Sequence, residues 1–155
     1  MKHSVSIVFI LLLLSLTACS TDKLSGNRPP DVLIEANGKT YETVLGSYCW
    51  SEGFHSTCVD TAGPIELLKD REPIKVKPGE SITILMDYKP KPKEYELYQV
   101  KENNKDTEIS LQDHQFTGPS SKGVYFYSYG VWWLDEEDSN MSNGDAFYAF
   151  SIEVE

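Results

Sequence analysis

Two cysteines and a histidine lie close together in the first half of the chain, at Cys49, His55 and Cys58. Two thiolates and an imidazole are ligands that copper or zinc accepts, so this segment could bind a metal. In an oxidising compartment the two thiols pair instead, and a disulfide that closes so short a loop stabilises a fold by about 2 to 3 kcal/mol. The sequence favours the disulfide, with two free thiols or the metal site as the alternatives.

A second group of potential ligands lies near the end of the chain, where carboxylates and amides crowd into Asp135–Asp145. Oxygen ligands of this kind bind calcium, but their spacing does not match an EF-hand loop. The favoured interpretation is a solvated hairpin loop whose charges keep the sheet from pairing at its edge. The candidate calcium ligands are Asp135, Asp138, Asn143 and Asp145.

Aromatic residues form the third group that could bind a ligand. Exposed tyrosine and tryptophan rings bind sugars and peptides because they bring a large rigid surface at a small cost in entropy. If Phe126 points inward, Tyr125, Tyr127 and Tyr129 share the opposite face as a ligand platform; the alternative is that most of these rings pack in the core. The candidate ligand-binding residues are Tyr48, Trp50, Phe54, Tyr125, Tyr127, Tyr129, Trp132 and Trp133.

Motifs for catalysis are absent from the sequence. The chain has no Gly-x-Ser-x-Gly, no His-Glu-x-x-His and no glycine loop for phosphates, and His55 and His114 sit in no known motif. The sequence therefore predicts a non-enzymatic protein without a cofactor. An envelope enzyme with an unrecognised site is the alternative, and it would require a deep pocket around one of these histidines.

The first residues have the layout of an export signal. Lys2 precedes an apolar run from Val5 to Leu16, which is too short to remain in a bilayer as a spanning helix. The stretch Leu16-Thr17-Ala18-Cys19 resembles the bacterial lipobox, in which the cysteine receives a diacylglycerol, and so acyl chains such as palmitate, before cleavage on its amino-terminal side. This resemblance implies a signal peptide over residues 1–18 and a mature chain that begins at Cys19; an ordinary secretory signal is the alternative.

A lipid on Cys19 would tether the protein to the extracytoplasmic face of the cell membrane without spanning it. The chain has a formal net charge of −10, and removal of Lys2 makes it more negative still. Such an acidic chain is repelled by nucleic acid, by other polyanions and by anionic lipid, which argues against nucleic acid, polyanions or the bilayer surface as its direct ligand. Cationic partners and calcium remain compatible with the charge.

Residues 19–30 are polar and end in Pro29-Pro30, which predicts a flexible tether, and residues 31–155 are long enough for one domain. Within that domain the hydrophobic period is two almost everywhere, and Asn37-Gly38 is a strong hairpin signal. Only 64–69 reads as a short connecting helix. These patterns predict an all-β fold, an antiparallel Ig-like β-sandwich. The expected strands are 32–36, 39–44, 74–77, 81–88, 94–100, 107–111, 124–133 and 146–154.

Three segments, Val76–Ile82, Gly123–Tyr127 and Ala146–Val154, resemble bacterial extracellular Ig-like modules. Gly46–Trp50 and Cys58–Asp60, together with the same final segment, resemble small uncharacterised lipoproteins of low-GC Gram-positive bacteria. That family has no assigned activity, so the resemblance implies a fold and a location and no catalytic residue.

Together these features predict a lipid-anchored module that binds a protein or a cell-envelope component through the loop 48–54 and the strand 125–133. A calcium- or transition-metal-binding module is the alternative.

Overall fold

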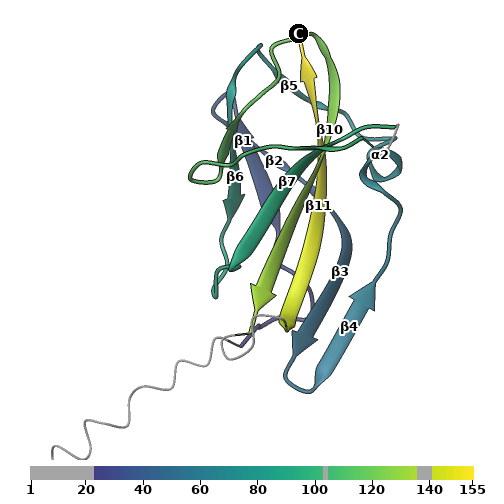
Figure 1. Ribbon diagram of the computed structural model, residues 1–155, viewed down its shortest axis with the longest axis vertical. Helices are drawn as coiled ribbons and strands as arrows, with labels where there is room; N and C mark the ends of the chain where they lie inside the picture. Colours follow the sequence, from purple (N-terminus) through teal and green to yellow (C-terminus); the bar gives the residue numbers. More distant parts are fainter. Residues whose placement is uncertain (1–22, 103–104, 136–140) are drawn as a thin grey trace, which may run out of the picture.

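The computed structural model describes residues 23–102, 105–135 and 141–155, and the chain folds as an all-β sandwich with one short helix (Figure 1). This confirms the predicted fold class. The predicted signal peptide, Cys19 and Asp138 lie outside the described residues. No helix in the described part of the chain is long and apolar enough to cross a membrane.

The first sheet is antiparallel and has four strands in the order β2-β1-β6-β9. The turn at Asn37-Gly38 joins β1 to β2, as the sequence predicts, with both residues at positive φ. The strands are β1 (Val32–Ala36), β2 (Lys39–Glu42), β6 (Ser81–Met86) and β9 (Gln115–Thr117).

The second sheet has the strand order β4-β3-β11-β10-β7-β8, and β5 pairs with β11 in parallel. The helix α2 (Pro64–Leu67) leads from β4 toward β5 and is shorter than the predicted 64–69. The strands are β3 (Val44–Glu52), β4 (His55–Val59), β5 (Ile74–Val76), β7 (Glu94–Val100), β8 (Thr107–Glu108), β10 (Gly123–Leu134) and β11 (Ser142–Val154).

The connections between the sheets are those of an immunoglobulin fold. The neighbours β7, β10 and β11 correspond to strands C, F and G, while β6 and β9 correspond to B and E. The chain crosses between the sheets after β2, β5, β6, β8 and β9. The hairpin β3–β4 is an addition beside β11, and in Figure 1 it extends past the ends of β10 and β11.

The core lies between the two sheets and follows the two-residue period of the strands. Ile34, Ile82 and Ile152 are almost completely buried, and Val131 lies among them. The inward face of β10 carries Tyr127 and Tyr129 next to the inward face of β11, so large aromatic rings fill the space between the sheets.

The segment 24–30, here called the N-terminal strap, packs on the domain, which corrects the predicted flexible tether for these residues; residues 19–22 of that prediction lie outside the described part of the chain. Leu24 is only 5% exposed and belongs to the core cluster. A Cβ atom at Gly144 would lie 2.6 Å from Leu24 Cδ1, so the strap packs against β11 as closely as a glycine permits. A single leucine among polar residues was too weak a hydrophobic signal to be recognised in the sequence.

Hydrogen bonds fix the strap to β3 and β11 of the second sheet and to the loop that follows β6. Trp50 Nε1 donates to the carbonyl of Gly26 over 2.7 Å, and the Tyr148 hydroxyl donates to the carbonyl of Pro30 over 2.6 Å. The Tyr88 hydroxyl accepts from the Ser25 amide and donates to the Ser25 carbonyl. The described domain therefore includes Leu24, which is five residues after Cys19 in the sequence.

Candidate functional site

The aromatic platform predicted on β10 is not on the surface. Tyr127 and Tyr129 point into the core, as does Trp133, and Trp50 of β3 is equally buried. Burial raises the pKa of Tyr127 and of Tyr129 well above the usual value for a phenol. These four rings cannot bind a ligand with their faces, which corrects the prediction. The reason is register: the tyrosine face of β10, and not that of Phe126, meets the first sheet.

The other predicted aromatic residues are scattered. Tyr48, Tyr125 and Trp132 are half-buried, and Trp132 packs edge-on against Phe147 of β11 at 5.5 Å. Phe54 is fully exposed, at 106% of its reference area, in the turn between β3 and β4. No continuous aromatic surface joins the loop 48–54 to β10.

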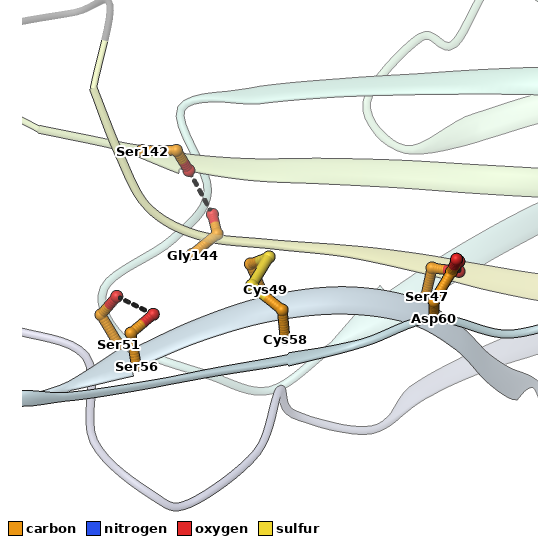
Figure 2. The surroundings of a disulfide bond; sticks show 8 residues. All are labelled: Ser47, Cys49, Ser51, Ser56, Cys58, Asp60, Ser142 and Gly144. Atoms are coloured by element: carbon orange, nitrogen blue, oxygen red, sulfur yellow. Dashed lines mark hydrogen bonds between the residues drawn. A yellow bond between two sulfur atoms is a disulfide. The ribbon is translucent and has the colours of Figure 1, made fainter.

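The cysteines form the predicted disulfide. Cys49 and Cys58 are directly opposite one another on β3 and β4, and their sulfur atoms are bonded (Figure 2). Polar pairs flank this link, with Ser51 donating to Ser56 over 3.2 Å and Ser47 donating to Asp60 over 3.0 Å. Because both sulfurs are bonded to each other, they cannot bind a metal, and the alternative prediction of a copper or zinc site with His55 is wrong. The link holds a strand, β4, that has no buried residue of its own.

The acidic loop is described only at its two ends. Asn143 Nδ2 donates to Asp135 Oδ2 over 3.2 Å, so two of the predicted calcium ligands are adjacent. Asp145 is opposite Cys49 on β3, and partial burial raises the pKa of its carboxyl group. Among residues 23–102, 105–135 and 141–155, no group of three histidines, cysteines or carboxylates is placed to hold a metal ion.

A cleft of about 330 Å³ lies at the margin of the sandwich where the chain crosses from β6 to β7. Its volume is at the lower end of the range for small-molecule sites, roughly 300 to 1,000 Å³, which suits one ring or one to two amino-acid side chains. We call it the β6–β7 cleft. It is lined by Thr83, Ile84, Leu85, Met86, Lys91, Pro92, Tyr95, Asp113, His114 and Tyr129.

The walls of the β6–β7 cleft combine an apolar interior with a charged rim. Ile84 and Tyr129 are buried at the core side, while Lys91 and Asp113 are exposed at the mouth. Tyr95 is 39% exposed, and its ring centre is 4.8 Å from that of His114 at a tilt of 45°. Such a lining can hold a ring by stacking while the rim charges bind its polar groups.

The turn that carries His114 has an unusual backbone. Gln112 and Gln115 exchange hydrogen bonds of 2.9 Å, and Asp113 and His114 between them have φ values of 50° and 61°. This is the pattern of a type I′ turn, which favours Asn-Gly, and a histidine there is strained. The conformation places His114 against Tyr95. This site could not be predicted from the sequence, because Asp113 is an ordinary turn residue and Tyr95 is an ordinary strand residue.

A larger cleft of about 660 Å³ lies between the strap and the start of β1. Several of its polar groups are already paired within the protein. Arg28 binds Asp31 at 2.9 Å, and the Thr43 hydroxyl donates to the carbonyl of Val32 at 2.8 Å. Tyr148, also in its lining, binds the strap. Because these polar groups are already paired within the protein, the β6–β7 cleft is the better candidate site.

Comparison of the chain with known protein families, with curated proteins and with solved structures finds no match. Its function is therefore argued from its own residues.

Proposed function

We propose that this protein is a lipid-anchored binding module on the extracytoplasmic face of the cell membrane, attached through Cys19. The export signal and the lipobox-like stretch support the anchor. The disulfide supports an oxidising location, because such bonds persist outside the cytoplasm. Because the strap is packed on the domain, only a few residues separate the domain from Cys19, and the lipid would hold the domain near the membrane surface.

The observation that carries the binding role is the contact between Tyr95 and His114 at the mouth of the β6–β7 cleft. A strained turn persists only where the surrounding structure holds it, and strain of this kind gathers at ligand sites. The ligand is a cell-envelope component or a protein that presents a ring or a short side chain with polar substituents. Binding without catalysis is the function that this lining supports, because its exposed groups are suited to stacking and to charge pairing.

Photocrosslinking in intact cells tests the role of the cleft. A benzophenone amino acid replaces Tyr95 at the cleft mouth, and in a control chain it replaces Val124, which is 48% exposed at the far end of β10. We expect a discrete covalent adduct from position 95 that weakens when His114 is also changed to alanine. If position 95 gives no more adduct than position 124, the binding role of the cleft is wrong.

A further inference from the structure

Phe54 is the most exposed large hydrophobic side chain in the described part of the protein. It follows Gly53, whose φ of 60° makes the turn between β3 and β4, and the turn extends past the neighbouring strands (Figure 1). A phenylalanine held in water at the tip of a disulfide-linked hairpin has no role in the core. Side chains in such positions are stabilised when an apolar phase covers them.

The hairpin tip lies at the same end of the molecule as the start of the described chain. Trp50 of β3 holds the strap, because its indole nitrogen donates to the carbonyl of Gly26. Trp50 and Leu24 also pack side by side against Gly144. From Trp50 the hairpin continues by two strand residues and the turn, so the tip reaches about 10 Å further. The first described residues and the tip thus share one end, which Figure 1 also shows.

The chain between the strap and the proposed lipid is short. Cys19 precedes Leu24 by five residues, which extend over at most about 18 Å. Leu24 is buried and cannot lengthen this connection. The strap end of the domain is therefore held within a few nanometres of the bilayer. Because the hairpin tip lies at the same end, it is close enough to touch the bilayer surface.

The loop between β6 and β7 lies at the same end. Trp133, in ring contact with Trp50 at 5.0 Å, donates to the carbonyl of Pro90 and so fixes this loop beside the strap. Lys89, Lys91 and Lys93 of the loop are exposed, and so are the carboxylates of Glu52, Asp87 and Glu94. The charges at this end are therefore mixed, which suits a surface of neutral headgroups better than an anionic one.

We infer that Phe54 inserts into the outer surface of the same bilayer that holds the Cys19 lipid, so that the domain has two points of contact with the membrane. This inference rests on the proposed lipid anchor. The partner is the lipid surface, because the short connection brings that surface within reach of the tip. Aromatic side chains are favoured at this depth, where a ring lies among headgroups and the first acyl carbons.

The test uses the full, lipidated chain reconstituted in phosphatidylcholine vesicles. Phe54→Trp places an indole at the tip, and brominated acyl chains quench any indole that enters the bilayer. Val124→Trp is the matched control, because Val124 is also exposed but lies at the opposite end of the domain. Trp50 and Trp133 are buried, and together with Trp132 they contribute the same background in every chain.

We expect the emission that Phe54→Trp adds to the wild-type signal to be blue-shifted in vesicles and to lose intensity in brominated vesicles, while the emission that Val124→Trp adds stays at the wavelength of an indole in water and is not quenched. Unquenched emission from a chain that floats with the vesicles overturns the inference and leaves the anchor standing. A blue shift without quenching that grows with protein density means that another copy covers the tip, which also overturns it. A chain that carries no lipid and does not float overturns the anchor and the inference together.

Discussion

The β3–β4 hairpin has an inner half beside β11, which contains Trp50, and an outer half at its tip, which contains Phe54. The two halves place similar side chains in opposite environments. Trp50 is 2% exposed and contacts the rings of Tyr88 and Trp133, whereas Phe54, only four residues later, is completely exposed. The difference lies in the partners, because Trp50 is opposite Gly144 of β11 and the strap covers it, while the tip extends past both. Hydrophobicity alone therefore does not tell a core residue from a surface residue in this fold.

The inner half of the hairpin should carry the larger part of the stability. We expect Trp50→Ala to lower the free energy of unfolding by about 3 to 5 kcal/mol, because it leaves a cavity between the strap and β11 and removes a hydrogen bond. Denaturant unfolding followed by circular dichroism measures this. A loss below about 1 kcal/mol would show that the strap and Trp50 do not form one packed unit.

The strap should behave as part of the inner half and not as a tether. Leu24→Ala should cost about 2 to 4 kcal/mol, because the side chain is buried against Trp50 and Gly144. Asn27→Ala in the same segment is the control, since Asn27 is exposed and should change stability by less than about 0.5 kcal/mol. Equal, small effects of the two changes in thermal unfolding would restore the flexible tether.

The disulfide joins β3 to β4, and its removal should lower the free energy of unfolding by less than the Trp50 change and by more than the Phe54 change. Replacing both Cys49 and Cys58 by serine should cost about 2 to 3 kcal/mol, because the link closes a short loop in the unfolded chain. The effect should concentrate in β4, which buries no residue. Hydrogen exchange resolved by residue measures this, with loss of protection in β4 exceeding that in β11; uniform loss would contradict the local role.

The tip should contribute almost nothing to folding. Phe54→Ser should change the free energy of unfolding by less than about 0.5 kcal/mol, because the ring makes no core contact that could be lost. Chemical unfolding of the detergent-solubilised protein gives this value. A loss of 2 kcal/mol or more would mean that Phe54 packs within the domain, and it would remove the contrast between the two halves.

The sequence predicted the fold well because alternation and turn chemistry are local. Asn37-Gly38 indicated the first hairpin, and the alternating segments 94–100 and 146–154 lie within β7 and β11. The strands β3 and β4 lie almost wholly outside the expected strands, which left 45–73 without one. The strand β9 was missed as well, since its three residues are too few to show a period. The disulfide was predicted from its cysteine spacing and the export signal.

The candidate site could not be predicted in the same way. Which face of β10 is buried depends on its register against β7 and β11, and both faces of that strand are rich in aromatic residues. Tyr95 and His114 come from segments joined only by tertiary packing, so no spacing in the sequence relates them. The strap was missed because one buried leucine, Leu24, has no pattern around it.

The proposed membrane anchor depends on lipidation of Cys19. Intact mass measurement of the protein extracted from membranes tests this lipidation, with Cys19→Ser as the matched chain. We expect a mature protein that starts at Cys19 and carries the mass of a diacylglycerol, and a serine variant that retains residues 1–18 without lipid. A wild-type chain with an unmodified Cys19, or normal cleavage of the variant, would contradict it.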